Sequence, residues 1–267
     1  MAQCIFCGFQ GKLSKEHLWA KWLAPYITKD MESYRSGSVI FNLPGTAPTE
    51  VKKKIGGDPR SRTSKCVCEP CNNGWMGDLQ EDAKSVVIPL LTGDQTTLHT
   101  RQQKLLASWI AMAVMCAEHA QGETNSAIPQ KDRVFFFRNR VLPKSGWRIW
   151  IGRYKRDRWS LHWTHHALTI SSEKEVLQRT PGSGLPPFNT QSTTYVVGEL
   201  YIHVMSSAYR KAVRLMKLVP PASDLLYEIW PPGRMAVWPP IRPLSDSEAH
   251  NISVSFFKAM RKIGSNE

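Results

Sequence analysis

Residues 68–76 read Cys-Glu-Pro-Cys-Asn-Asn-Gly-Trp-Met, which places a Cys-x-x-Cys pair directly before a polar run. A second pair with the same spacing, Cys4 with Cys7, stands near the beginning of the sequence. Each pair can present two thiolates from one tight turn, and four thiolates complete a tetrahedral zinc site. Because such a site has no open coordination position, its metal stabilises the fold and does not react. We therefore predict a structural zinc bound by Cys4, Cys7, Cys68 and Cys71.

The other two cysteines have different expected roles. Cys66 is an alternative ligand, although its distance along the chain from Cys71 is less usual for a zinc knuckle. Cys116 lies within an apolar run and is expected in the core. The first residues show no export signal, so we expect a cytoplasmic protein whose cysteines stay reduced. No run of about 18 or more apolar residues suggests a membrane span.

The composition is that of a globular protein with a basic surplus. Of the 267 residues, 42% are hydrophobic and 21% are charged, which excludes a wholly disordered or collagen-like chain. The net charge of +13 favours a polyanionic partner. Two segments carry this surplus: 52–65 holds six basic residues against one acidic residue, and 131–158 holds ten against two.

Such concentrated charge resembles a phosphate-binding surface, and we expect DNA as the partner. A solvated charged face is the alternative for either segment alone. Arginines interleaved with tryptophans could also stack on bases, although alternating tryptophans are more often core residues. The predicted nucleic-acid contacts are Lys52, Lys53, Lys54, Arg60, Arg62, Arg148, Arg153, Arg156 and Arg158.

The cysteines divide the chain into two predicted parts. Residues 1–95 contain five of the six cysteines and are expected to form a zinc-stabilised module with an insertion at 30–65. Within the insertion, residues 33–62 are rich in Gly, Pro, Ser and Thr, which predicts a long loop. Residues 96–267 are expected to form a helical spine and an α+β C-terminal domain, in which strands dominate.

The spine is predicted from a helix-start signal and the apolar stretch that follows it. Thr100 and Gln103 match a capping box. From Leu105 to Met115, apolar residues recur at helical spacing with further apolar residues between them. This breadth predicts a helix that is buried on most sides.

The second half shows the texture of a β-rich domain. Runs of β-branched and aromatic residues predict strands at 134–137, 147–151, 159–163 and 195–205. The remaining expectations are a turn at 156–157, a loop at 179–193, extended Trp-Pro-Pro segments at 230–232 and 238–240, and a final helix at 245–263. The predicted fold class is therefore α+β.

A Glu16-His17 step lies between the two cysteine pairs, and Asn72 follows the second pair directly. This arrangement resembles the HNH endonuclease superfamily, in the branch where a zinc site braces a ββα-metal active site. The likeness is greatest to bacterial and phage HNH proteins with a Cys-x-x-Cys-Asn-Asn-Gly-Trp-Met motif. The part that carries the motifs spans residues 4–80. The resemblance implies that residues 1–95 form an HNH nuclease module.

The resemblance also implies the roles of individual residues. His17 would be the general base that takes a proton from water. Glu16 and Asn72 would hold a catalytic Mg²⁺ or Mn²⁺, which would stabilise the leaving oxygen. The family has a middle Asn a few positions before the second cysteine pair, and this chain has none there. Thr63, or Asn42 from the insertion, could take its place.

Two other patterns have simpler interpretations. Trp75, Leu79 and Ala83 follow helical spacing after Asn72, which predicts the packing face of a helix. A second candidate metal site is a group of histidines on a predicted strand, but strand alternation favours an ordinary polar face for them. These histidines are His162, His165 and His166.

The sequence thus predicts a metal-dependent HNH endonuclease acting on DNA, in phage defence or in a mobile element. One alternative is a zinc-organised nucleic-acid-binding protein without nuclease activity. Another is an effector nuclease that cuts only when a partner ATPase or sensor licenses it.

Overall fold

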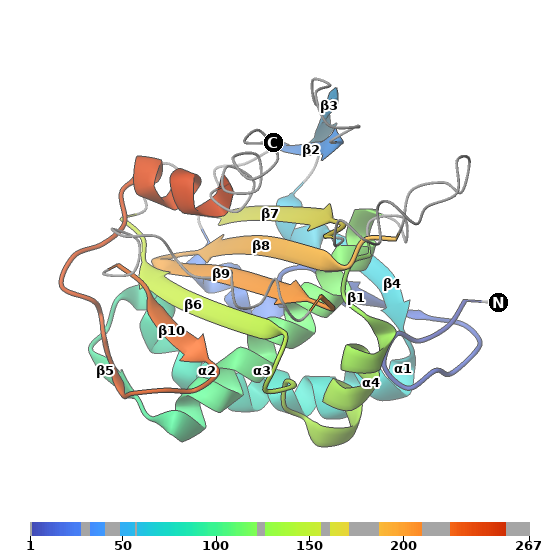
Figure 1. Ribbon diagram of the computed structural model, residues 1–267, viewed down its shortest axis with the longest axis horizontal. Coiled ribbons are helices and arrows are strands. Elements are labelled where there is room, and N and C mark those ends of the chain that lie inside the picture. The colour runs from blue at the N-terminus through green and yellow to red at the C-terminus, as the bar shows by residue number, and fades with distance from the viewer. Residues whose placement is uncertain are drawn as a thin grey trace.

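The computed structural model describes residues 2–27, 33–40, 49–56, 58–121, 126–155, 161–170, 187–209 and 225–254 (Figure 1). It combines helices and strands, as the predicted α+β class requires. None of the described helices is long and apolar enough to cross a membrane.

The elements of the first half include the strand pair on which the candidate site is built. They are β1 (Ser14–His17), the 3₁₀ helix η1 (Lys21–Tyr26), β2 (Ser33–Ile40), β3 (Thr49–Gly56), η2 (Pro59–Ser61), β4 (Thr63–Val67), α1 (Glu69–Asn73), α2 (Trp75–Thr92) and β5 (Thr96–Leu98).

The second half supplies the long central helix and the main sheet. Its elements are α3 (Thr100–Ala117), η3 (Glu118–Gln121), α4 (Gln130–Asn139), β6 (Trp147–Arg153), β7 (Leu161–Leu168), β8 (Thr190–Val197), β9 (Leu200–Ser207), β10 (Tyr227–Trp230) and β11 (Ala236–Trp238), followed by a helical segment at 246–254.

A five-stranded antiparallel sheet organises the second half, with the strand order β10-β6-β9-β8-β7. Figure 1 shows α2 and α3 below this sheet. On the opposite face, Ala249 and Ile252 of the helical segment 246–254 join a smaller core with Trp150 and Tyr201. Because the sheet is covered on both faces, the inner strands β8 and β9 are buried along their whole length.

In the first half, two strands and a helix form a ββα arrangement. β1 pairs antiparallel with β4, and His17 lies opposite Thr63 in the register. β4 leads directly into α1, and α2 follows after Gly74. Residues far apart in the chain, at 14–17 and 63–73, are therefore neighbours in space.

The insertion between β1 and β4 is not the long loop that its composition predicts. β2 and β3 pair antiparallel over their full length, from Ser33 opposite Gly56 to Ile40 opposite Thr49. The prediction gave weight to the Gly, Pro, Ser and Thr content of the insertion. It overlooked the β-branched residues that both strands also contain, which favour strand structure.

Residues 134–137 form part of a helix, α4, and not the predicted strand. The prediction relied on the aromatic and β-branched character of the run. In the structure, Arg133 and Phe136 are buried and Phe137 packs against the core, so the inward positions recur three and four apart. Pro129 precedes the first turn in extended conformation and starts the helix.

The single strand expected at 195–205 is a hairpin of β8 and β9 instead. Gly198 adopts a φ of 56°, a left-handed conformation that suits the tight turn between them. β8 begins at Thr190, so the predicted loop at 179–193 ends earlier than expected.

The other expectations for this half are met in part. The strand predicted at 147–151 is β6, the one predicted at 159–163 overlaps β7 from Leu161, and the two Trp-Pro-Pro segments begin at the ends of β10 and β11. β6 and β7 are separated in the sheet by β9 and β8, so they form no hairpin. The predicted turn at 156–157 and the end of the final helix lie outside the described residues.

One hydrophobic core runs through both halves of the described chain. Phe6 near the N-terminus packs edge-to-face on Trp75, with ring centroids 5.0 Å apart. Both rings also contact Phe136 of α4, at 6.2 and 5.7 Å. Gln130 Nε2 adds a 2.8 Å hydrogen bond to the carbonyl oxygen of Ile5. The start of the chain is therefore packed against an element that follows residue 95.

Gln103 does not form the predicted capping box. The residue that precedes α3 is His99, and its side chain makes no capping hydrogen bond. The buried Gln103 side chain instead donates from Nε2 to the carbonyls of Leu98 and Arg234, at 2.9 and 2.8 Å. Its Oε1 accepts from the backbone N–H of Gly233 at 3.0 Å. Gln103 thus joins α3 to β5 and to the loop before β11.

Gln103→Met should lower the free energy of unfolding by about 3 kcal/mol, because it leaves buried backbone groups without their hydrogen bonds. Denaturant unfolding measures this change. The same substitution at Gln102, whose buried Oε1 has no hydrogen-bond partner in the described structure, is the control and should cost much less. Equal losses for the two variants would contradict the assignment.

Histidines are buried in the sheet in their neutral form. His203 in β9 is completely buried, and its Nδ1 lies 3.0 Å from Thr194 Oγ1. Burial, reinforced by the nearby His166, lowers the pKa of His203 to about 3. Burial likewise lowers the pKa of His166 to about 4. Both side chains resist protonation while the protein is folded.

The free energy of unfolding should therefore fall as the pH drops below about 6.5, where unfolded histidines take up protons that the folded ones refuse. His203→Gln should flatten this dependence by about 1.4 kcal/mol per pH unit between about pH 6 and pH 4. Denaturant unfolding at several pH values tests this expectation. An unchanged slope in His203→Gln would contradict this account.

Candidate functional site

Four of the cysteines converge at the junction between the N-terminal turn and α1. The sulfur atoms of Cys4, Cys7, Cys68 and Cys71 all lie within 4.8 Å of one another, and this is the one such group of metal-ligating side chains in the described chain. The Sγ atoms of Cys7 and Cys68 are 3.5 Å apart. Four thiols at this separation can hold a metal ion such as zinc.

Local backbone structure presents each pair. The Cys4 carbonyl accepts from the Gly8 N–H at 3.1 Å, which closes the first turn, and Gly8 has a left-handed φ of 78°. Cys68 precedes α1 in extended conformation, and Cys71 lies within that helix. Burial raises the pKa of Cys71, so its thiolate requires a compensating positive charge.

The two remaining cysteines stand apart from this cluster. Cys66 Sγ points to the carbonyl oxygen of Cys116, at 3.8 Å. Cys116 itself is buried in α3, as the sequence predicts. Cys66, the alternative ligand, therefore does not belong to the group of four.

Glu16 and His17 form the end of β1, where they lie opposite Ser64 and Thr63 of β4. Burial raises the pKa of Glu16 to about 7, despite a hydrogen bond from the His17 backbone. Burial and the neighbouring Lys21 cation lower the pKa of His17. The His17 imidazole is thus neutral near pH 7, the state in which it can accept a proton.

Asn72 connects α1 to β1. Its Nδ2 donates to Ser14 Oγ at 2.7 Å and to the Lys15 carbonyl at 3.4 Å. Both contacts use the amide nitrogen, which leaves Oδ1 as the atom that can bind a cation. The structure therefore brings Asn72 to the strand that carries Glu16 and His17.

Of the two candidates for the family's middle residue, Thr63 lies directly opposite His17 in the β1–β4 register. Asn42 lies outside the described residues. Thr63 is half-buried and begins β4. It is thus the candidate that the described fold brings next to His17.

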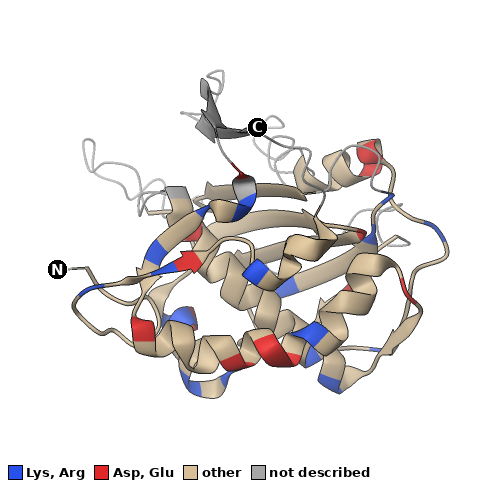
Figure 2. Ribbon diagram, turned by 180° about the vertical axis from the view of Figure 1, so that it is seen from behind, with Lys and Arg blue, Asp and Glu red and all other residues tan. Residues whose placement is uncertain are grey.

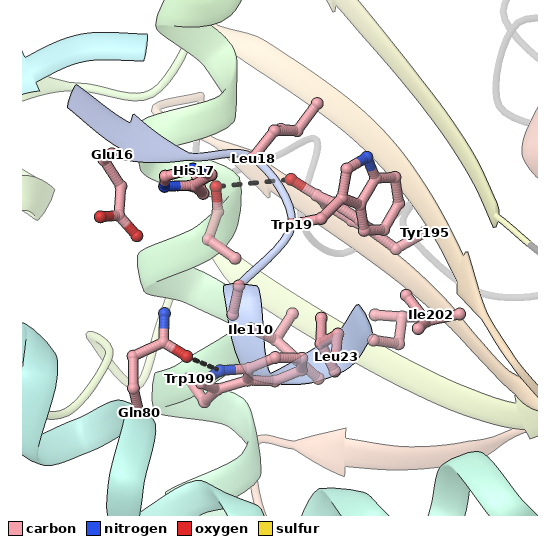
Figure 3. Close-up of a pocket in the computed structure, with 13 residues that line it drawn as sticks. Glu16, His17, Leu18, Trp19, Leu23, Gln80, Trp109, Ile110, Tyr195 and Ile202 are labelled. Carbon is pink, nitrogen blue, oxygen red and sulfur yellow. Dashed lines mark hydrogen bonds between the residues drawn. The ribbon is translucent and has the colours of Figure 1, made fainter. Parts of the chain in front are cut away.

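A pocket opens beside Glu16 and His17, between β1, the helices α2 and α3, and the main sheet (Figure 3). Its polar lining includes Gln80 of α2, which the sequence analysis missed. Gln80 lies four residues after Met76 and three before Ala83, and both of these residues are buried. This spacing places a polar residue on the inner face of α2, and that pattern could have identified Gln80 as a candidate site residue. The other lining residues drawn with labels are Leu18, Trp19, Leu23, Trp109, Ile110, Tyr195 and Ile202.

The packing face predicted for the helix after Asn72 is present. Ala83 is completely buried, and Trp75 and Leu79 pack against the core.

The predicted histidine group lies on β7, where His165 Nδ1 is 2.7 Å from Thr193 Oγ1. His165 Nε2 lies 3.6 Å from the buried Glu118 carboxylate.

All four described arginines that were predicted to contact nucleic acid have partners within the protein. Figure 2 shows acidic residues interspersed among basic ones along the helices. Arg62 stacks over the Trp163 ring, 5.3 Å from its centroid. Three others form ion pairs with carboxylates: Arg60 with Asp58, Arg148 with Glu228, and Arg153 with Glu199.

The remaining predicted contacts are not tested by the side-chain geometry. Lys52, Lys53 and Lys54 lie in β3, where Lys54 pairs with Arg35 in the hairpin register. Arg156 and Arg158 lie outside the described residues.

Comparison of the chain with protein-family models, with curated proteins and with solved structures returns no match. The functional interpretation therefore depends on the arrangement of the residues themselves.

Purified protein should contain about one zinc ion per chain, as four thiolates in one tetrahedral site require. Cys68→Ala should give insoluble or metal-free protein, because it removes a ligand from the site. Elemental analysis measures the metal content. Cys116→Ala is the matched control, since this buried cysteine lies outside the cluster, and it should retain the zinc. Folded wild-type protein without bound metal would refute the assignment.

Proposed function

We propose that this protein is a metal-dependent HNH-type endonuclease that hydrolyses phosphodiester bonds in DNA, and that it acts in the cytoplasm. The observation that carries the proposal is the convergence of β1, β4 and α1 next to the four cysteines. In this ββα order Asn72 is hydrogen-bonded to Ser14 and Lys15 of β1, the strand that ends in Glu16 and His17, which supports the proposal that the three residues form one site.

His17 is proposed as the general base. Its lowered pKa keeps the imidazole neutral near pH 7, so that it can take the proton from an attacking water. Thr63, opposite it in the register, is proposed to orient the imidazole. A base held at a strand end has limited freedom, which favours productive orientation.

Glu16 and Asn72 are proposed to hold a divalent cation, Mg²⁺ or Mn²⁺. The donor set fits, because a carboxylate and an amide oxygen are the hard ligands that these ions prefer. Burial leaves the Glu16 carboxyl close to its midpoint of ionisation at pH 7, and a cation would favour the charged form. The cation would supply positive charge for the oxygen that leaves the phosphorus.

The cysteine cluster is proposed to bind structural zinc, because four sulfur ligands fill the tetrahedral coordination of the ion and leave no position for a substrate. Its metal would join the N-terminal turn to α1. That connection holds β1 against the helix that carries Asn72.

A zinc-organised nucleic-acid-binding protein without cleavage is the second candidate. The distribution of charge favours it, because residues 52–65 hold six basic residues against one acidic residue, and such a segment suits contact with phosphates.

Purified zinc-loaded protein should cut plasmid DNA when Mg²⁺ or Mn²⁺ is added and should not cut when the ion is omitted. His17→Ala should lower the rate by at least about 100-fold, the usual contribution of a general base. His99→Ala, at an exposed histidine, is the matched control and should cut normally. Gel electrophoresis follows the reaction.

Shifted but intact DNA under every ion condition would contradict the endonuclease and favour the second candidate. Cutting that persists in His17→Ala would contradict the role of His17. Retained zinc in each variant must be checked, so that loss of activity is not loss of the fold.

A further inference from the structure

Gln80 has an amide whose orientation is set by two tryptophans. Its Oε1 accepts hydrogen bonds from Trp22 Nε1 at 3.0 Å and from Trp109 Nε1 at 2.9 Å. The two indoles come from η1 and α3, and their rings contact each other at 5.9 Å between centroids. An amide oxygen has two lone pairs, and both are used here. A flipped amide would direct its N–H groups at two N–H donors, so Nε2 is held on the other side.

The free end of this amide is directed at the candidate active site. Gln80 and Glu16 line the same pocket, and in Figure 3 the Nε2 group and the Glu16 carboxylate extend toward one another from α2 and β1. The hydroxyl of Tyr195, another polar group of this lining, points to the carbonyl oxygen of Ala113 at 3.4 Å. The Trp109 indole nitrogen already donates to Gln80.

We propose that Gln80 is a positioning residue for Glu16: no hydrogen bond joins the two side chains in the described structure, and when a divalent cation binds, the fixed N–H of Gln80 donates to the carboxylate and leaves its remaining lone pairs to the cation. This inference rests on the proposed function, since it assigns a partner to the proposed cation ligand. A half-buried carboxylate gains from a fixed donor, because a hydrogen bond to the charged form favours that form. Partners of this kind orient metal ligands and raise metal affinity.

Two substitutions at Gln80 should change cation affinity in opposite directions. Gln80→Met removes the donor, and Mn²⁺ binding should weaken by roughly tenfold, the usual effect of losing such a partner. Gln80→Glu keeps an oxygen that can accept from both indoles and adds a second carboxylate beside Glu16. Mn²⁺ binding should then become tighter than in the wild type, because the site gains negative charge. A residue that only packs the core would show no loss of Mn²⁺ affinity in Gln80→Met, and Gln80→Glu tests whether this position lies close enough to Glu16 to share the cation.

The measurement is Mn²⁺ binding to zinc-loaded protein without DNA, by titration calorimetry or by the electron paramagnetic resonance signal of free Mn²⁺. Gln103→Met is the matched control: it makes the same substitution at another buried, hydrogen-bonded glutamine that does not line this pocket, and it should bind Mn²⁺ as the wild type does. Thermal unfolding of each variant separates lost affinity from lost structure.

The outcomes separate this inference from the proposed function. Wild-type protein that binds Mn²⁺ while both Gln80 variants bind it equally well would overturn the role of Gln80 and leave the endonuclease standing. Wild-type protein that binds no Mn²⁺ would overturn both. If Gln80→Met fails to fold, Gln80→Glu alone decides, since it retains the acceptor for Trp22 and Trp109; unchanged affinity in it refutes the proposal.

Discussion

The contact between the N-terminal turn and the start of α1 is the constraint on which the candidate site depends. The four sulfur atoms within 4.8 Å of one another join two chain segments that are separated by the whole insertion. The hydrogen bonds from Asn72 to Ser14 and Lys15 continue the same contact toward β1. A bound metal would add ligand bonds to this junction and offset the entropy of closing a long loop.

The electrostatics of the site follow from partial burial of its two titratable groups. Desolvation acts in opposite directions on an acid and a base, since it always disfavours the charged form. It raises the pKa of Glu16 and lowers that of His17, so both groups tend toward neutrality in the free protein. A neutral imidazole is ready to accept a proton, whereas the carboxyl needs a positive charge or a donor to ionise. The amide of Gln80, which two indoles orient, is the donor that we propose for it.

Short-range patterns in the sequence predicted the local features, and long-range packing decided the rest. Cysteine spacing identified the four-sulfur cluster because the geometry of a Cys-x-x-Cys turn is local. The strand predicted at 134–137 was wrong, since its aromatic residues pack at helical intervals against Trp75 of α2 and Phe6 of the N-terminal turn, which are distant in sequence. Gln103 and Gln80 could not be assigned either, because their partners come from distant segments. The placement of Thr63 opposite His17 likewise depends on a strand pairing across the insertion.

The shared core has a consequence for the first 95 residues when they are taken alone. The rings of Phe6 and Trp75 are covered by Phe136, and Gln130 is hydrogen-bonded to the backbone of Ile5. A gene fusion that transferred only the first 95 residues would strip these rings of their cover, and exposed aromatic surface promotes aggregation. The first 95 residues are therefore not expected to remain soluble when they are separated from the helices and sheet that follow.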